Sequence, residues 1–320
     1  MNKRPLVSII IPTFKRANYL ERCINSALEQ SYTNIEILVI DDNNENSVYR
    51  KNTELLMKKY LENEKIRYIK HKVNKNGAAA RNTGIKNCTG KYITFLDDDD
   101  TFEYNRIEKL VAILEDEENK EFAGVYTNII IKNRKETQEL REISICKSGN
   151  LKRELLLQRF TVGSGSNMFF KRNILDYLNG FDERFKRHQD WEFLIRFFRE
   201  NKLYYLDEML VTKYMDSRIN YPNSYTLEEV KNIFLETFNS DIKEYDSETQ
   251  KIIIFKHELD LIFSYINDLR LKKASKLINK NKEYIEYIHY ITMAKIFIKS
   301  IIKELLKVLR KNNEEINNKH

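Results

Sequence analysis

The sequence predicts an α/β fold in which a mostly parallel sheet is flanked by helices, followed by a C-terminal helical extension. Two observations lead to this class. Over the first hundred residues, short apolar runs alternate with segments of helical periodicity, the pattern of strands and helices in turn. From about residue 226 the apolar spacing is helical as far as the C-terminus. We therefore expect an α/β domain over residues 1–219 and a helical region over residues 220–320.

The individual elements follow in regular order. Strands are expected at residues 6–12, 35–40, 66–70 and 92–96, and later at 122–131, 166–171 and 203–210. Helices are expected at residues 18–30, 51–63, 78–88 and 189–200. Gly90 stands where a C-terminal cap of the helix over 78–88 is expected.

Composition and charge exclude several classes of protein. The chain has 320 residues, 42% of them hydrophobic, and its 3 cysteines form no CxxC pair, which favours a reducing, cytoplasmic location. Pro12 interrupts the apolar run near the N-terminus, and no apolar run is long enough for a membrane span, so neither a signal peptide nor a membrane helix is expected. Residues 271–320 hold 12 Lys or Arg against 5 Asp or Glu and so carry the whole net charge of +7. Nucleic acid is not an expected partner, because its binding proteins more often spread positive charge over a reading surface.

Polar residues follow three of the predicted strands. They are Pro12 to Arg16 after the first strand, Asp41 and Asp42 after the second, and Asp97 to Asp100 after the fourth. The carboxyl ends of parallel strands lie at one edge of a sheet, where such folds bind their ligands. The sequence therefore predicts a binding site at this edge.

Four consecutive aspartates are electrostatically costly unless a cation lies among them or water reaches them. Mg²⁺ or Mn²⁺ would suit them, because hard cations take oxygen ligands and often bind through one or two carboxylates plus substrate phosphates. The alternative is a solvated acidic turn that caps the helix near residue 104. The position of the run, at the same edge as Asp41, favours the metal.

Other candidates also have two interpretations. Asp41 either caps a following helix or accepts hydrogen bonds from a base or ribose. Arg81 suits a phosphate or carbonyl, but alone it is more often a structural ion-pair residue. Asp190 either caps the helix over 189–200 or acts as a general base. His188 could assist it or contact a metal.

Taken together, these pieces resemble a family 2 glycosyltransferase with the GT-A fold. The resemblance rests on five stretches in the family's order, covering roughly residues 5–200: VSIIIPTFKR, EILVIDD, NKNGAAARNTGI, YITFLDDDD and GFDERFKRHQDWEFLIRF. Residues 220–320 lie outside it.

The resemblance implies a role for each matching residue. It places Pro12, Thr13 and Arg16 beside the nucleotide, Asp41 on the base, Arg81 near the base or phosphates, Asp97 near the ribose, Asp99 on the metal, and Asp190 as the catalytic base. Asp98 is counted with the nucleotide ligands, since four aspartates leave the register of the metal ligand open by one residue. Gln189 replaces the glutamate that usually precedes the base, and Asn43 and Asn44 replace the usual glycine and serine.

The implied enzyme is an inverting, Mn²⁺- or Mg²⁺-dependent hexosyl- or N-acetylhexosaminyl-transferase. It would use a nucleotide-diphosphate sugar, with UDP as the first choice, and a hydroxyl of a saccharide or lipid-linked acceptor in envelope or capsular polysaccharide synthesis. The loop from Ser164 to Ser166 is expected on the acceptor side. One alternative is an inactive, transferase-like binding or assembly subunit. Another nucleotide-using or phosphate-cleaving metal enzyme is disfavoured, because no P-loop and no GxGxxG follows the first strand.

Residues 288–310 predict a basic amphipathic helix, because an apolar stripe runs beside lysines 295, 299, 303 and 307. Such a helix suits an anionic membrane surface, which would make the protein peripheral on the inner face of the cell membrane. It would equally suit packing on the domain or on a second subunit.

Overall fold

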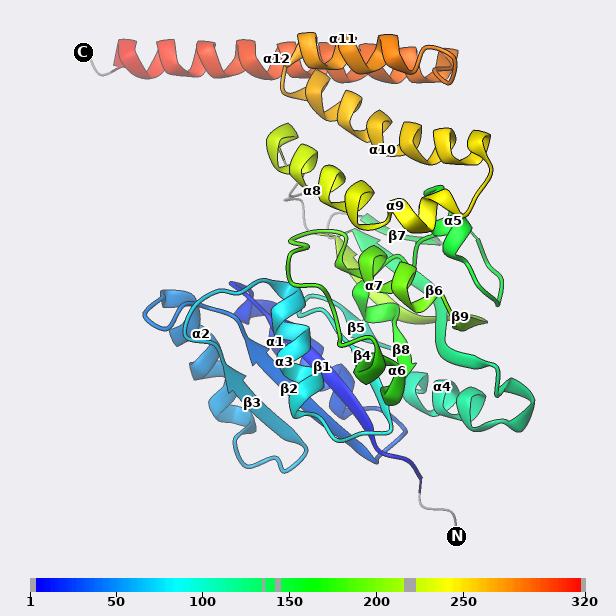
Figure 1. Cartoon of the computed structure of the whole chain (residues 1–320). Coiled ribbons are helices and arrows are strands. Elements are labelled where there is room, and N and C mark those ends of the chain that lie inside the picture. The colour runs from blue at the N-terminus through cyan, green and yellow to red at the C-terminus, as the bar shows by residue number, and fades with distance from the viewer. Residues whose placement is uncertain (1–3, 134–135, 142–144, 216–222, 318–320) are drawn as a thin grey trace. The chain divides into compact units, whose positions relative to one another are not determined.

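The computed structural model describes residues 4–133, 136–141, 145–215 and 223–317 (Figure 1). The chain divides into two compact units, residues 1–219 and 220–320. Whether these units act as separate domains stays a prediction.

The described part of the first unit contains one mixed sheet in the order β3-β2-β1-β4-β8-β6-β9-β5, with β7 paired to β6. Strands β3, β2, β1 and β4 run parallel, whereas β8 is antiparallel to both β4 and β6. The strands are β1 (Val7–Thr13), β2 (Ile35–Asp41), β3 (Ile66–Lys70), β4 (Tyr92–Phe95), β5 (Thr101–Phe102), β6 (Phe122–Asn133), β7 (Glu136–Arg141), β8 (Phe169–Lys171) and β9 (Lys202–Met215). The helices are α1 (Ala17–Leu28), α2 (Val48–Met57), α3 (Gly77–Asn87), α4 (Arg106–Glu115), α5 (Lys152–Leu156), α6 (Arg172–Tyr177) and α7 (Gln189–Phe197). The predicted class, a mostly parallel α/β sheet with flanking helices and a helical C-terminal region, is confirmed.

Strand β1 is buried on both faces, as its mostly apolar sequence predicts for a central parallel strand. Ile9 and Ile11 belong to a core cluster that includes residues of α1 and α4. Ile10 points the other way, toward α3. Helices therefore cover both faces of the sheet at β1.

Two glycines allow close packing beside β1. A Cβ atom at Gly84 of α3 would lie 2.4 Å from Cγ2 of Ile10, so the helix approaches the strand too closely for a side chain. Gly90 was expected as a helix cap, but the cap position is Cys88. The Gly90 N–H donates to Ser8 Oγ, and a Cβ there would lie 2.7 Å from the Ser8 nitrogen. Gly90 is thus required for close approach to β1.

One strand and one helix have bounds that differ from those predicted. Of the predicted strand 166–171, only β8 is extended, because residues 165–167 form a single 3₁₀ turn whose Ser166 and Asn167 are buried. The predicted helix 51–63 ends at Met57 and continues only as a 3₁₀ turn to Tyr60.

The second unit is helical throughout its described residues. Its helices are α8 (Ser224–Thr237), α9 (Asn239–Lys243), α10 (Ser247–Asn267), α11 (Leu271–Lys280) and α12 (Tyr287–Asn317). Its core lies around α10, where Ile262 and Tyr265 pack with Ala274 of α11 and Met293 of α12. No helix within the described residues is both long and apolar enough to cross a membrane.

Replacing Gly84 by alanine tests the close contact between α3 and β1. Overpacking against Ile10 is expected to cost about 2–3 kcal/mol, because a Cβ there would lie 2.4 Å from that side chain. The higher helix propensity of alanine offsets about 1 kcal/mol of this cost, so the free energy of unfolding should fall by about 1–2 kcal/mol. Urea unfolding followed by circular dichroism measures it, with Lys86→Ala on an exposed part of α3 as the matched control. Unchanged or higher stability of Gly84→Ala would show that the helix can move away from the strand.

Candidate functional site

The predicted site residues gather where β1, β2 and β4 end. The parallel register pairs Thr13, the last residue of β1, with Asp41, the last residue of β2. The four aspartates begin two residues after Phe95, the end of β4, and the loop after β1 contacts them. The expectation that the strand ends deliver polar groups to one edge is met by these contacts.

Asp98 is held by the end of β1. Its Oδ2 accepts a hydrogen bond of 2.8 Å from Thr13 Oγ1 and one of 3.3 Å from the backbone N–H of Phe14. Burial raises the pKa of Asp98 to about 7, although the nearby Arg16 guanidinium opposes the shift. The side chain therefore fixes the loop after β1 and lies too deep to reach far into solvent.

Asp99 is paired with a half-exposed arginine, which also contacts Asp98. Its Oδ2 lies 2.6 Å from Arg16 Nη1, whose side chain is about half exposed at 49%. The backbone carbonyl of Asp99 accepts a bond of 2.7 Å from Arg22 on α1. Burial raises the pKa of the Asp99 carboxyl, and Arg16 partly offsets this. A divalent cation could take the place of Arg16 on this carboxylate.

Asp97 is linked to α3 and α7 through Arg81. Arg81 Nη2 donates to Asp97 Oδ1 at 2.5 Å, and Arg81 Nη1 donates to Gln189 Oε1 at 2.9 Å. The departure from the family pattern at residue 189 thus lies on the same arginine that holds the first aspartate. The hydrogen bond to the uncharged amide of Gln189 helps to orient the Arg81 side chain.

Asp100 is held by two hydroxyls that the sequence did not indicate as its partners. Ser164 Oγ and Ser166 Oγ each donate to its Oδ2 at 2.7 Å, and Ser166 Oγ also accepts from the Asp97 N–H. Burial, with the charges of Asp97 and Asp99, raises the pKa of Asp100 to about 7. The loop from Ser164 to Ser166 therefore contacts the acidic run, and its place on the acceptor side stays a prediction.

The carboxylates fit a metal held by one protein ligand and not by a cage. No group of three or more His, Cys, Asp or Glu within the described residues could hold a metal ion. Asp97, Asp98 and Asp100 each accept a hydrogen bond from a group other than Arg16, whereas the Asp99 carboxylate is paired with Arg16, which also contacts Asp98. Mg²⁺ and Mn²⁺ commonly bind through one or two carboxylates plus substrate phosphates, so Asp99 with a diphosphate fits such an ion.

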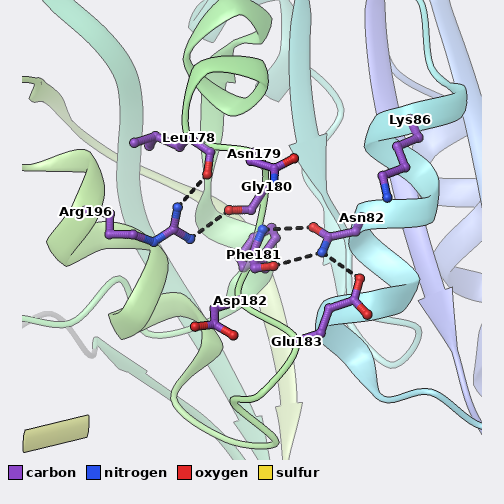
Figure 2. Close-up of a pocket in the computed structure, with 9 residues that line it drawn as sticks. All are labelled: Asn82, Lys86, Leu178, Asn179, Gly180, Phe181, Asp182, Glu183 and Arg196. Carbon is purple, nitrogen blue, oxygen red and sulfur yellow. Dashed lines mark hydrogen bonds between the residues drawn. The ribbon is translucent and has the colours of Figure 1, made fainter. Parts of the chain in front are cut away.

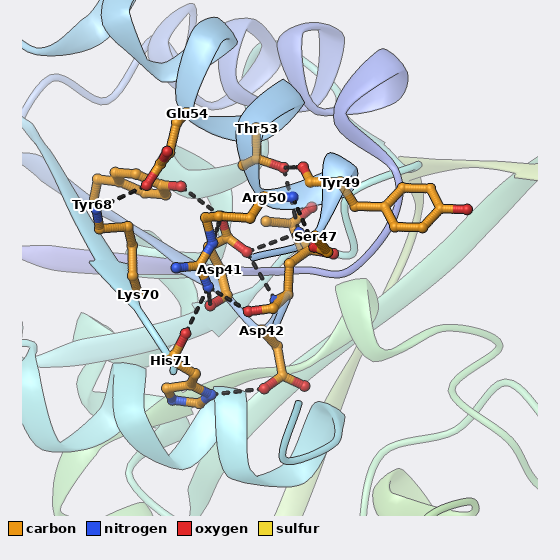
Figure 3. Close-up of polar contacts among 12 residues, drawn as sticks. Asp41, Asp42, Ser47, Tyr49, Arg50, Thr53, Glu54, Tyr68, Lys70 and His71 are labelled. Atoms are coloured by element: carbon orange, nitrogen blue, oxygen red, sulfur yellow. Dashed lines mark hydrogen bonds and ion pairs between the residues drawn. The ribbon is translucent and has the colours of Figure 1, made fainter. Parts of the chain in front are cut away.

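Asp41 is deeply buried in a polar network (Figure 3). It has no exposed surface, and its Oδ2 pairs with Arg50 Nε at 2.9 Å and accepts a hydrogen bond from the Tyr68 hydroxyl. Its Oδ1 accepts from the backbone N–H and the side chain of Asn43. Both carboxylate oxygens of Asp41 are therefore held by groups of the protein, and these contacts shape the loop after β2. Direct contact of Asp41 with a base stays a prediction.

Arg50 and Asp42 extend this network toward α3. Arg50 Nη2 donates to the carbonyls of Asp41, Asn43 and His71. Asp42 Oδ1 lies 2.7 Å from His71 Nδ1, and Asp42 also accepts from the backbone N–H groups of Lys75 and Asn76. Asp42 thereby holds the turn that begins α3, the helix that carries Arg81.

Asp190 lies in the first turn of α7. It lines a cavity of about 460 Å³ together with Arg81, Asp97, Gly163 and Lys213. Burial raises the pKa of its carboxyl, opposed by the backbone N–H of Trp191 and the charge of Arg81. The predicted base and the first aspartate of the run therefore share one cavity.

A second cavity, of about 420 Å³, shows how the segment before α7 is held (Figure 2). Asn82 of α3 accepts from the N–H of Phe181 and donates to its carbonyl. Arg196 of α7 donates to the carbonyls of Leu178 and Gly180. The polar groups lining this cavity thus tie α3 to α7, which fixes Arg81 relative to Asp190.

Comparison with known proteins assigns the chain to a family. The model of "Glycosyl transferase family 2" matches residues 8–178, more than half of the chain. The chain belongs to glycosyl transferase family 2.

Relatives within and around this family differ in length. An uncharacterized glycosyltransferase of Rickettsia bellii is 34% identical over 211 residues, which cover 65% of this chain but only 29% of that protein. Among solved structures, S. aureus TarS 1-349 in complex with UDP-GlcNAc is similar at a TM-score of 0.61 and 17% identity, covering 92% of this chain and 81% of that one. The mannosyltransferase PcManGT from Pyrobaculum calidifontis, in complex with GDP-Man and Mn²⁺, is similar at a TM-score of 0.55 and 16% identity, covering 95% and 88%. At these identities the two structures support the GT-A-like fold.

Arg16→Ala tests whether Arg16 and a divalent cation compete for Asp99 of this family 2 protein. Without nucleotide, Mn²⁺ is expected to bind the variant about fivefold more tightly, since Asp99 loses the cation that lies 2.6 Å away. Electron paramagnetic resonance of free Mn²⁺ measures this binding without any need for turnover. Arg184→Ala removes an exposed arginine paired with Asp182 and serves as the matched control. Equal affinity of Arg16→Ala and the unmodified chain would contradict the competition.

Proposed function

We propose that the protein is an inverting, metal-dependent glycosyltransferase that moves a hexosyl or N-acetylhexosaminyl group from a nucleotide-diphosphate sugar to a hydroxyl. The observation that carries the proposal is the shared cavity of Asp97 and Asp190. Asp97, the first residue of the acidic run, lines this cavity together with Arg81, whose guanidinium suits the diphosphate. Asp190 presents a carboxylate there that can receive a proton.

The donor half of the site comprises Pro12, Thr13, Arg16, Asp41, Arg81, Asp97 and Asp98 as nucleotide-binding residues, with Asp99 on the metal. The two similar structures support this assignment by analogy, since one contains UDP-GlcNAc and the other GDP-Man with Mn²⁺. UDP is our first choice of nucleotide and Mn²⁺ or Mg²⁺ our choice of metal.

The chain's own residues divide the chemistry between them. Asp190 Oδ accepts the proton of the acceptor hydroxyl, which attacks the anomeric carbon from the face opposite the leaving diphosphate. Arg81, fixed by Asp97 and Gln189, supplies a positive charge beside the diphosphate. A cation on Asp99 would stabilise the negative charge that develops on the leaving group. One direct displacement inverts the configuration at the anomeric carbon.

The acceptor is proposed to be a saccharide or a lipid-linked saccharide of envelope or capsular polysaccharide synthesis. Such an acceptor would place the enzyme at the inner face of a membrane. The basic C-terminal helix supports that location.

An inactive binding or assembly subunit is the alternative. It would bind the nucleotide without turnover. Retention of Asp97, Asp99 and Asp190, with Asp97 and Asp190 lining one cavity, favours the enzyme.

Slow donor hydrolysis without acceptor is the first test. With Mn²⁺, one of a panel of UDP-, GDP- and dTDP-sugars is expected to release nucleotide, and EDTA should abolish release. Asp190→Asn is expected to lower the rate about 10²–10⁴-fold through loss of the base, and Asp99→Asn to lower it through loss of metal binding. Asp176→Asn, an exposed aspartate paired with Arg172, is the matched control. Nucleotide binding with no turnover of any donor over a broad acceptor panel would support the inactive subunit instead.

The pH dependence of the same rate tests the base. Burial raises the pKa of Asp190 above its ordinary value of 3.8, so the carboxylate is lost at a higher pH than an exposed aspartate would be. At saturating donor and Mn²⁺, the rate should be constant at neutral pH and fall about tenfold per unit below the raised pKa. A rate that stayed constant down to pH 4, about the ordinary aspartate pKa, would argue against Asp190 as the titrating base.

A further inference from the structure

Helix α12, drawn from orange to red in Figure 1, has two different apolar faces. One face is internal to the second unit. Met293 and Ser300 are buried there, Ile296 is partly buried, and Met293 packs in the cluster around α10. At about 100° per residue these three side chains lie on one side of the helix. This face has its partner.

The opposite face is apolar and exposed. Ile298 is 58% exposed and Leu305 is 59% exposed, although both are aliphatic. Among the side chains of α12 that the structure describes, nine large hydrophobic ones are exposed: Tyr287, Ile288, Tyr290, Phe297, Ile298, Ile301, Ile302, Leu305 and Leu306. We call this set the outer face of α12. An apolar patch of this extent marks a surface that meets a partner or a membrane.

Lysines border the outer face on one side. Lys295, Lys299 and Lys303 recur every fourth residue and are exposed, so they form a row parallel to the helix axis. No acidic residue occurs from Tyr287 to Lys303. The lysine row beside the outer face therefore carries positive charge that no acidic side chain between residues 287 and 303 neutralises.

We infer that the outer face of α12 binds an anionic lipid bilayer, with the helix lying in the plane of the interface. Its apolar side chains would enter the boundary between head groups and acyl chains, and the lysine row would contact anionic head groups. Isoleucine, leucine, phenylalanine and tyrosine beside lysine are the composition of such helices.

The same features disfavour a second copy of the chain as the partner. A two-stranded helical seam uses a narrow stripe at two positions in seven, flanked by opposite charges that pair across it. The outer face is wider than such a stripe, because it extends from Tyr290 and Phe297 at one margin to Ile288 and Ile302 at the other. Lysines 295, 299 and 303 would find no acidic partner between residues 287 and 303 of a second copy. An anionic lipid surface can contact the full width of the outer face and can also pair with the lysines beside it.

This inference deepens the proposed function and depends on it only for its purpose. A membrane-bound second unit would bring the enzyme to a lipid-linked acceptor. Lipid binding itself can be measured without turnover, so the two proposals can fail separately.

Vesicle co-sedimentation of the full chain tests the inference. The chain is expected to bind vesicles of phosphatidylcholine with 30% phosphatidylglycerol, at least tenfold more tightly than vesicles of phosphatidylcholine alone. Replacing Ile298 and Ile302 by serine should weaken binding to the anionic vesicles at least tenfold without changing charge. Leu55→Ser with Leu61→Ser removes two exposed aliphatic residues of the first unit and is the matched control.

The lysine row has its own variant. Lys295→Gln with Lys299→Gln should weaken binding to anionic vesicles by about fivefold per lysine. Lys243→Gln with Lys251→Gln, two exposed lysines elsewhere in the second unit, should leave it unchanged.

Three results would overturn the inference. They are equal binding of the chain to anionic and neutral vesicles, unchanged binding of the Ile298 and Ile302 variant, or a dimer in sedimentation velocity that this variant converts to monomer without any vesicle binding. Donor hydrolysis in solution, measured on the same variant, should equal that of the unmodified chain. Its loss in every preparation would count against the proposed function and leave the lipid result intact.

Discussion

The repulsion among four consecutive carboxylates is the constraint on which the arrangement of the first unit depends. Each carboxylate has its own main partner, although Arg16 contacts both Asp98 and Asp99. Asp98 takes the end of β1, Asp99 the arginine before α1, and Asp97 the arginine of α3. Asp100 takes the serines before β8. These contacts hold four loops together at one edge of the sheet. No single cation has to compensate the negative charge of all four aspartates.

A second polar network, buried around Asp41 and Arg50, supports this edge of the sheet. Removing either Asp41 or Arg50 would leave the other charge buried and unpaired, which is costly. Arg50 Nη2 also donates to the backbone carbonyls of Asp41 and His71. Asp42 continues the network to the turn before α3. The position of Arg81 thus depends on residues at the end of β2 that need not touch a substrate. A scaffold of this kind keeps the polar groups of the site in fixed directions before any ligand binds.

The sequence predicts those parts of the fold and site that have a local signature. The apolar run of β1 and the acidic run after β4 are such signatures, and both lie where they were expected. Arg50 and His71 gave no local signal, because their importance comes from contacts with loops distant in the sequence. The same is true of Gly90, whose small size matters only because Ser8 lies beside it. The two faces of α12 could not be separated by periodicity alone, since burial depends on which side α10 covers.

Gln189 shows how one departure from the family pattern fits the electrostatics of the site. By the family resemblance, a glutamate is more usual at this position. A glutamate at this contact would give Arg81 two carboxylate partners, Asp97 and residue 189, and would place a further negative charge next to Asp190. Like charges nearby raise the pKa of a carboxyl, and burial already raises that of Asp190. The amide of Gln189 accepts the same hydrogen bond from Arg81 without this charge. It therefore orients the arginine without adding a negative charge and leaves Asp190 easier to ionise, which suits the roles proposed for both residues.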